Sequence, residues 1–419
     1  MAMEILLDAH VKRWISRRWM ALALCMLLVT ATIVRHADGF GDLDDDDDEN
    51  DDDEDEFDFM STKLERSPPA SRDECVVGAT GDSTCAAATD TEVTSVVTRG
   101  LVTTKPKIRD ILKEHSRTAD PELRAFTGET LGYVTPWNGA GYDVAKTFRA
   151  KFSYIAPVWF QIREDPKSRT PILTGTHDID RDWIAAVRRP VASGDAPKIV
   201  PRVVYERNKL ASDDIPVLIE ILLRVTQDEG FDGLVFEIPI IAGTMELLVR
   251  TGEAFTEAGK LLLLVLTRSS NEGQLPVTHE MMEQLLPVVH RFTMNAYDFQ
   301  TPGPNAPMPW IAATIDHFTE AEKEKILMGI PFYGYDNRDA VTGSSYIKSL
   351  QHDDVSSIRW DASAQECFHH YTERGSRHVV YYPCLQFIAN RLRLFQDSGL
   401  AGAAIWEIGQ GLDYFLDLF

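Results

Sequence analysis

The stretch Phe231-Asp232-Gly233-Leu234-Val235-Phe236-Glu237-Ile238-Pro239 decides the fold of this chain. Its apolar residues predict a strand over 231–238 with both faces buried, and Pro239 suits the strand's end because it has no N–H to donate. Side chains alternate along a strand, so Val235, Glu237 and Pro239 share one face. A lone carboxylate among apolar neighbours points to a specific role for Glu237.

Apolar segments of strand length recur along the chain, most of them starting about 30 residues apart with helical patterns between. The run 261–266 fits a buried helix turn on periodicity alone, but its length and position favour a strand. Eight strands alternating with helices predict an α/β fold, a (β/α)8 TIM barrel over 99–419, with a small α/β insertion at 334–400 before the last strand. The predicted strands are 131–136, 152–161, 199–205, 231–238, 261–267, 292–299, 326–332 and 401–406.

Aromatic and acidic side chains follow the predicted strands at their C-terminal ends, where such barrels place their working residues. Aromatic rings can stack on a pyranose, and carboxylates can accept hydrogen bonds from its hydroxyls. Ordinary barrel packing is the alternative for any one of these aromatics. The predicted saccharide-binding residues are Tyr133, Trp137, Trp159, Glu237, Tyr297, Asp298, Tyr333 and Trp406.

The stretch that begins at Asp232 resembles the signature Asp-Gly-x-Asp-x-Asp-x-Glu of family 18 glycoside hydrolases, the chitinases. Asp232 and Gly233 match it. Val235 stands where the first inner Asp belongs, Glu237 where the second belongs, and Pro239 where the proton-donating Glu belongs.

Three further segments resemble the same family in the right order. Tyr297-Asp298 is similar to the pair on the sixth chitinase strand, 326–334 to the seventh strand, and 404–407 to the eighth with its Trp. The resemblance covers about 130–419. It implies that Tyr297 meets the substrate acetamide and that Trp406 forms the floor of the cleft.

The resemblance also implies a lost activity. In this family the substrate's own acetamide attacks the anomeric carbon while one Glu protonates the leaving oxygen. Proline has no proton to give, and general acid catalysis is typically worth about 10²–10⁴-fold. Glu237 lies two residues back, about 6.6 Å along the strand, which is too deep to reach the same bond.

The sequence therefore predicts a non-catalytic, chitinase-like protein that binds N-acetylglucosamine oligosaccharides or related glycans, with no catalytic residue assigned. Two alternatives stay open: a weak glycoside hydrolase that uses a displaced carboxylate, Glu237 or Glu407, and a scaffold that binds a protein receptor. No cofactor is predicted. His177-Asp178 could be a metal or catalytic pair, but Asp178 and Asp180 precede a helical pattern and suit helix capping better, so no metal is predicted.

The charge of the chain argues against nucleic acid as a partner. The net charge is −23, but fourteen acidic residues lie within 42–58, and without them it would be −9. Binding to phosphates calls for basic patches, which this composition does not favour.

The N-terminal region predicts a secretory route. Basic residues at 12–18 precede an uncharged, largely apolar run at 19–34, so 1–37 is a signal peptide or a signal anchor. Its sixteen residues fall short of the roughly 20 that a membrane span needs, and a membrane is expected only if the segment is retained. Residues 38–98, acidic and then rich in Ser and Thr, are predicted to be disordered. The expected location is outside the cell or in the endolysosomal lumen.

Four cysteines remain if Cys25 leaves with the signal. A secreted chain with an even number permits two disulfides, and closeness in sequence predicts Cys75 with Cys85 and Cys367 with Cys384. Free buried thiols are an equal alternative for the second pair.

Overall fold

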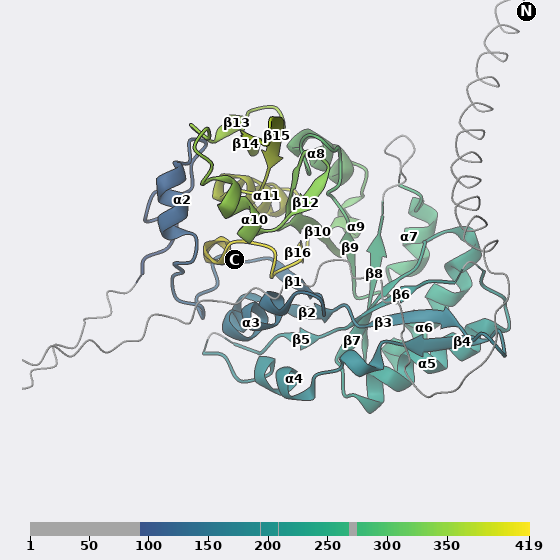
Figure 1. The fold of residues 1–419 in the computed structure, drawn as a ribbon. Helices are drawn as coiled ribbons and strands as arrows, with labels where there is room; N and C mark the ends of the chain where they lie inside the picture. Colours follow the sequence, from purple (N-terminus) through teal and green to yellow (C-terminus); the bar gives the residue numbers. More distant parts are fainter. Residues whose placement is uncertain (1–92, 193, 208, 268–274) are drawn as a thin grey trace, which may run out of the picture. The chain divides into compact units, whose positions relative to one another are not determined.

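The computed structural model describes residues 93–419 except 193, 208 and 268–274 (Figure 1). The predicted signal segment, most of the segment predicted to be disordered, and the Cys75–Cys85 pair lie outside the described residues. Within the described ranges, no helix is long and apolar enough to cross a membrane.

An eleven-stranded sheet forms the centre of the domain, in the order β4-β3-β6-β7-β8-β9-β10-β16-β1-β2-β5. All its pairings are parallel except the β3–β4 hairpin. Its strands are β1 (Glu129–Val134), β2 (Tyr154–Pro157), β3 (Phe160–Glu164), β4 (Pro171–Thr174), β5 (Lys198–Ile199), β6 (Arg202–Tyr205), β7 (Gly233–Glu237), β8 (Leu261–Leu266), β9 (Arg291–Met294), β10 (Ile326–Pro331) and β16 (Gly402–Trp406).

Two interrupted segments close this sheet into a barrel. β2 and β3 are separated by two residues, 158–159, and β5 and β6 by another two, 200–201. The first halves pair with each other, as do the second halves, while β2 also pairs with β1 and β6 with β7. The last strand, β16, pairs with both β10 and β1. The predicted (β/α)8 barrel is confirmed, and 261–266 is a strand.

Helices follow the barrel strands and surround them (Figure 1). Helix α4 shows how the sequence starts one: the Asp180 carboxylate accepts a hydrogen bond from the Trp183 N–H at 2.8 Å, as the capping interpretation predicts. His177, with an 83% exposed side chain, lies in the turn before it. The helices that follow barrel strands are α3 (Gly139–Thr147), α4 (Arg181–Val187), α5 (Asp214–Asp228), α6 (Met245–Glu257), α7 (His279–Leu285), α8 (Met308–Asp316), α9 (Glu320–Lys323) and α11 (Leu385–Asp397).

Alternation along the strands separates an inner core inside the barrel from an outer core beneath the helices. On β7, Val235 belongs to the inner core, while Leu234 and Phe236 belong to the outer core. Both sets are fully buried. The side-chain period of two therefore fixes which residues of each strand can reach the barrel interior.

A polar cluster lies at the N-terminal end of the barrel. Arg291 donates two hydrogen bonds to Glu129, at 2.6 and 2.7 Å, and the Tyr154 hydroxyl contacts Glu129 and the His290 ring. Burial, with Arg291 beside it, lowers the pKa of His290 to about 4, so this ring is neutral at physiological pH. Such a cluster at this end of a barrel indicates a role in stability.

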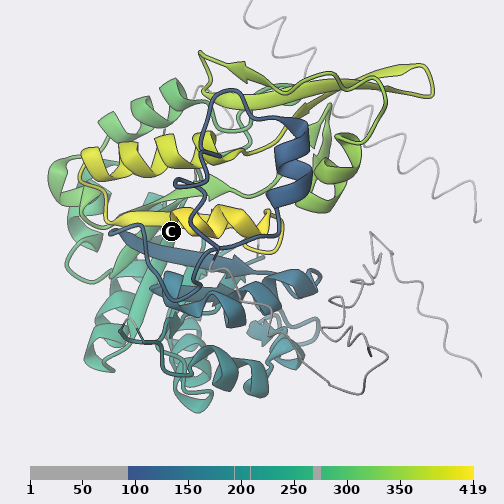
Figure 2. The ribbon, with the colours of Figure 1, turned by 90° about the vertical axis from the view of Figure 1, so that its left-hand side faces the viewer.

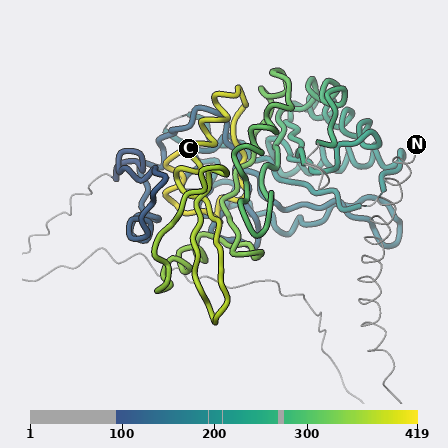
Figure 3. The backbone as a smooth tube through the Cα atoms, turned by 90° about the horizontal axis from the view of Figure 1, so that it is seen from above, coloured from purple at the N-terminus to yellow at the C-terminus, as the bar shows by residue number. Residues whose placement is uncertain are grey.

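The predicted insertion lies between β10 and α11. It is an antiparallel sheet in the order β12-β11-β15-β14-β13 with one helix, and its β14–β15 hairpin extends away from the barrel (Figure 3). Its elements are β11 (Gly334–Asp336), β12 (Asp339–Val341), α10 (Gly343–Ser349), β13 (Arg359–Asp361), β14 (Glu366–Glu373) and β15 (Ser376–Tyr381). The disulfide Cys367–Cys384 is present and joins β14 to the residue that caps α11.

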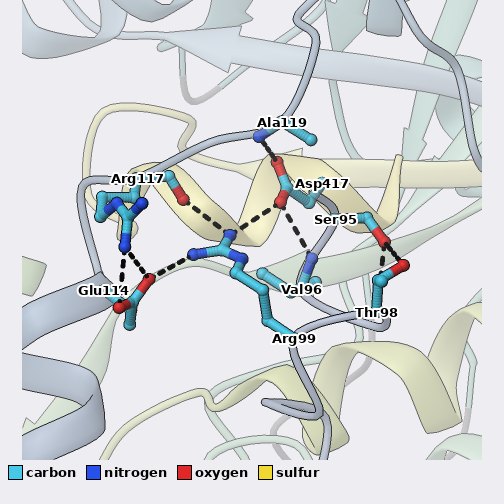
Figure 4. Close-up of polar contacts among 8 residues, drawn as sticks. All are labelled: Ser95, Val96, Thr98, Arg99, Glu114, Arg117, Ala119 and Asp417. Atoms are coloured by element: carbon cyan, nitrogen blue, oxygen red, sulfur yellow. Dashed lines mark hydrogen bonds and ion pairs between the residues drawn. The ribbon is translucent and has the colours of Figure 1, made fainter. Parts of the chain in front are cut away.

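The N-terminal part of the described chain, from residue 93 to helix α2, packs against the C-terminal segment η4 (Asp413–Leu418). The two run side by side in Figure 2. Arg99 bridges Glu114 of α2 (Ile108–Glu114), at 2.7 Å, to Asp417, at 3.1 Å (Figure 4). Asp417 also accepts the N–H of Val96, whose side chain is fully buried. Residues 95–98, assigned above to the disordered segment, thus take part in the packed domain, because this ion-pair network and one buried valine hold them.

Removing the disulfide should destabilise the domain. The bridge spans 17 residues, and a loop of this size is worth about 3 kcal/mol of unfolding free energy. We expect urea denaturation of the double variant Cys367→Ser/Cys384→Ser to show a loss of that size, with wild type in reductant showing the same loss. An unchanged free energy of unfolding, together with free thiols in non-reduced peptide mass spectra of wild type, would contradict the bridge.

Candidate functional site

A cavity of about 210 Å³ opens where the strands end on the C-terminal side of the barrel. It is smaller than most ligand pockets, which run from about 300 to 1,000 Å³. Six elements or the loops after them supply its lining. The lining residues are Tyr133, Arg202, Glu237, Val265, Asn295, Tyr297, Asp298 and Trp406.

Five of the eight predicted binding residues therefore meet in one place, namely Tyr133, Glu237, Tyr297, Asp298 and Trp406. Tyr333 lies beside them, because its hydroxyl donates a hydrogen bond to Asp298. The structure brings these side chains together; their contact with a saccharide stays a prediction.

The other two lie elsewhere. Trp159 is fully buried in the outer core, where its indole N–H donates to the Tyr142 hydroxyl at 2.7 Å and its ring packs on Trp183. Tyr154, Ala156 and Val158 belong to the inner core, so alternation along this segment places the Trp159 side chain on the opposite face, toward the helices. Trp137 is 69% exposed in the loop after β1 and does not line the cavity.

Arg202 is a cavity residue that the sequence analysis missed. Its Nε and Nη2 atoms pair with the Glu237 carboxylate, and its guanidinium carbon lies 5.1 Å from the centre of the Trp406 ring. The guanidinium thus combines an ion pair with a cation–π contact. The available signal was a charged residue at an inward position of β6, in register with Val235 of β7.

The residues at the positions of the family signature do not gather at the cavity. Pro239 lies beyond the end of β7 and is exposed, and Val235 packs in the inner core. Asp232 pairs with Arg188 at 2.7 Å and accepts the Ile199 N–H at 2.8 Å, before the strand begins. Of this signature, Glu237 alone presents a carboxylate to the cavity, and that carboxylate is paired with arginine.

Asp298 and two tyrosines form the opposite part of the site. Asp298 has a left-handed backbone, with φ of 64°, and its Oδ1 atom accepts hydrogen bonds from the Tyr333 hydroxyl and, at 2.6 Å, from the Tyr335 hydroxyl. Burial and the Asp298 carboxylate raise the pKa of Tyr335 to about 12. Burial and Asp298 also raise the pKa of Tyr333, so both phenols are protonated donors at neutral pH. Tyr335, on β11 of the insertion, is a second residue that the sequence analysis missed.

The remaining polar groups of the cavity are paired with neighbours. The Tyr297 hydroxyl donates to Asn295 at 2.9 Å, and the Tyr133 hydroxyl contacts Thr293 at 2.9 Å. Burial raises the pKa of Tyr133 to about 12 and that of Tyr297 well above its ordinary value. The lining thus combines neutral phenol hydroxyls, one amide, the Asp298 carboxylate and the Arg202–Glu237 ion pair with the apolar Val265 and the ring of Trp406.

Glu407 directly follows Trp406 but is fully buried and does not line the cavity. Its carboxylate accepts hydrogen bonds from the Asn138 amide and, at 2.9 Å, from the Gly409 N–H. Burial outweighs these donors and raises the pKa of Glu407 to about 7. Among the residues with described coordinates, no three His, Cys, Asp or Glu side chains gather as a metal site.

Residues 208–411 match the family model described as "Glycosyl hydrolases family 18". This region is a family 18 domain. It includes β7, the insertion and six of the cavity residues, from Glu237 to Trp406.

Solved enzymes share the fold. The chitinase from Chromobacterium violaceum ATCC 12472 is 20% identical with a TM-score of 0.60, over 70% of this chain and 98% of that one. The spore cortex-lytic enzyme SleL of Bacillus megaterium QM B1551 is 16% identical with a TM-score of 0.55, over 70% and 74%. A family 18 chitinase from Cycas revoluta in complex with (GlcNAc)4 is 15% identical with a TM-score of 0.56, over 69% and 97%. At these identities the likeness establishes a common fold.

The raised pKa of Glu407 predicts a pH-dependent stability. The ordinary pKa of a glutamate is 4.5, and the pKa of Glu407 in the folded state is about 7. Between these two pH values the folded state holds a proton that the unfolded state has released. The free energy of unfolding therefore falls as pH rises through this window, by up to about 3 kcal/mol from this one group.

Urea denaturation at pH 4.5–8 checks this. The difference in unfolding free energy between wild type and Glu407→Gln should change by about 3 kcal/mol across the window, while Glu246→Gln, on the exposed face of α6, should run parallel to wild type. Parallel curves for wild type and Glu407→Gln would contradict the assignment.

Proposed function

We propose that this domain is a non-catalytic, chitinase-like binder of N-acetylglucosamine oligosaccharides or related glycans. One observation carries the proposal: the cavity keeps its aromatic floor and hydroxyl donors, but Pro239 stands in place of the acid and Glu237 is held by Arg202. An ion-paired carboxylate is a poor proton donor, because protonation would break the pair.

The lining fits a sugar. Trp406 and the tyrosines offer aromatic surface with polar tips, while Asn295, Asp298 and the Arg202–Glu237 pair offer hydrogen-bond partners for hydroxyl and acetamide groups. The small volume suits a single ring at the bottom of the site, with the rest of the chain lying outside. The Cycas revoluta chitinase of the same fold was solved with (GlcNAc)4, which makes this oligosaccharide the natural first probe.

The alternative is weak hydrolysis by a carboxylate at another position than the missing acid. The geometry favours neither Glu237 nor Glu407 in this role. Glu237 is ion-paired, and Glu407 is fully buried outside the cavity lining. We therefore propose binding in preference to weak hydrolysis.

Three short segments of the sequence support a closer relationship to one branch of the family. The segments 132–138, 302–307 and 406–414 resemble chitinase domain-containing protein 1, and we propose that the chain belongs with that branch. The resemblance implies a secreted or endolysosomal protein that binds saccharides without catalysis. A protein receptor is a further partner consistent with such a location.

Calorimetric titration with the N-acetylglucosamine tetramer tests the proposed function. We expect saturable heat that ends after each injection, and no shortened oligosaccharide by chromatography over hours. Continuing heat with product would establish turnover and overturn the non-catalytic assignment. No heat at all, in folded protein, would overturn binding of this glycan.

The floor tryptophan provides the first variant. Trp406→Ala should weaken tetramer binding by about tenfold or more, because it removes the ring on which a pyranose would stack. Trp406→Phe should recover much of the affinity, whereas Trp360→Ala, on β13 away from the cavity, should bind as wild type. Unchanged affinity in folded Trp406→Ala would place the saccharide elsewhere.

A further inference from the structure

Asp298 occupies a backbone conformation that it would not hold unaided. Its φ of 64° lies in the left-handed region, which a non-glycine residue seldom occupies unless its surroundings impose it. In this conformation the Asp298 carboxylate lies at the cavity and accepts hydrogen bonds from the hydroxyls of Tyr333 and Tyr335. The residues that impose it therefore control part of the site without touching the cavity.

Asn305, in the loop between β9 and α8, is the principal such residue. Its Oδ1 atom accepts the N–H of Asp298 at 2.8 Å, and its carbonyl accepts the N–H of Phe299 at 2.9 Å. Its amide group donates to the carbonyl of Tyr333 at 3.2 Å. One side chain, only 2% exposed, thus binds the turn that carries Asp298 to the strand end that carries Tyr333.

The insertion in turn fixes Asn305. The Glu366 carboxylate, on β14, accepts the N–H of Asn305 at 3.0 Å and the N–H of Ala306 at 2.7 Å. Glu366 is 3% exposed, and Arg391 of α11 lies 3.8 Å from it while donating to the carbonyl of Ala306. A buried carboxylate that accepts two backbone N–H groups beside an arginine is a rigid anchor.

We propose that Asn305 is a positioning residue that holds Asp298 in the cavity, and that the insertion, through Glu366, holds Asn305 in place. Asn305 acts through Asp298 and does not touch the ligand. The insertion thereby sets the geometry of a site to which it contributes Tyr335 from its own first strand. The ligand arm of the test below rests on the proposed function, and the spectroscopic arm does not.

The spectroscopic arm uses ¹³Cζ-labelled tyrosine at neutral pH, since this resonance reports the hydrogen bond of each hydroxyl. Asp298→Asn should move the signals of Tyr333 and Tyr335, assigned with Tyr→Phe variants, and Asn305→Ala should move the same two signals. The control is Gln396→Ala, which removes an exposed amide in the last turn of α11, bonded to Thr127, and should leave them in place. Unmoved signals in folded Asn305→Ala would overturn the proposal.

The ligand arm is a double-mutant cycle with the N-acetylglucosamine tetramer. Asn305→Ala should weaken binding about tenfold in the wild-type background, the size of one lost buried hydrogen bond, and should cost little in the Asp298→Asn background. Glu366→Gln should follow the same pattern with a smaller loss. Equal losses in both backgrounds would show a general structural effect and overturn the positioning role.

The two arms separate the failures. Moved tyrosine signals without tetramer binding by wild type would refute the proposed function and leave the positioning role standing. Binding by wild type with unmoved signals in Asn305→Ala would do the reverse.

Discussion

A charged pair held inside a closed barrel is the constraint on which this site depends. Arg202 and Glu237 lie on neighbouring strands and pair at the cavity, where their side chains are 15% and 23% exposed. Pairing offsets the desolvation cost that either charge would carry without a partner at such a partly buried position. The pair also gives Trp406 a guanidinium partner. The pairing also constrains the chemistry of the site, because the one carboxylate that the incomplete signature presents to the cavity is bonded to an arginine.

Most of the architecture could be predicted because it depends on local pattern. Apolar runs of strand length, their spacing, and the gap before the last strand predict eight barrel strands and an insertion, and the structure has both. The alternation around Glu237 also places Val235 in the inner core correctly. The residues at which the strands and the packed domain begin and end were harder to predict. β7 ends at Glu237, two residues before Pro239. The packed domain begins before residue 99, because Val96 and Arg99 contact Asp417, which lies more than 300 residues further along the chain.

The residues that the sequence analysis missed are those whose role depends on register between distant segments. In the sequence, Arg202 is a single polar residue in a predicted strand. Its role becomes visible only when β6 pairs with β7 in the sheet. Tyr335, Asn305 and Glu366 belong to segments with no shared motif, and only the fold brings them to Asp298. Trp159 is a different case: alternation with the inner-core residues Ala156 and Val158 places its side chain toward the helices, and the choice of aromatics near strand ends did not take that alternation into account.

The disulfide has a consequence for how the protein must be prepared. Cys367 is the neighbour of Glu366 in β14, and Cys384 begins the helix that carries Arg391, so the bridge ties together the two elements that anchor the loop of Asp298. Protein made in a reducing cytosol would lack this tie beside the loop of Asp298. Affinity should therefore be measured on protein whose disulfide has formed, in a secretory compartment or in vitro.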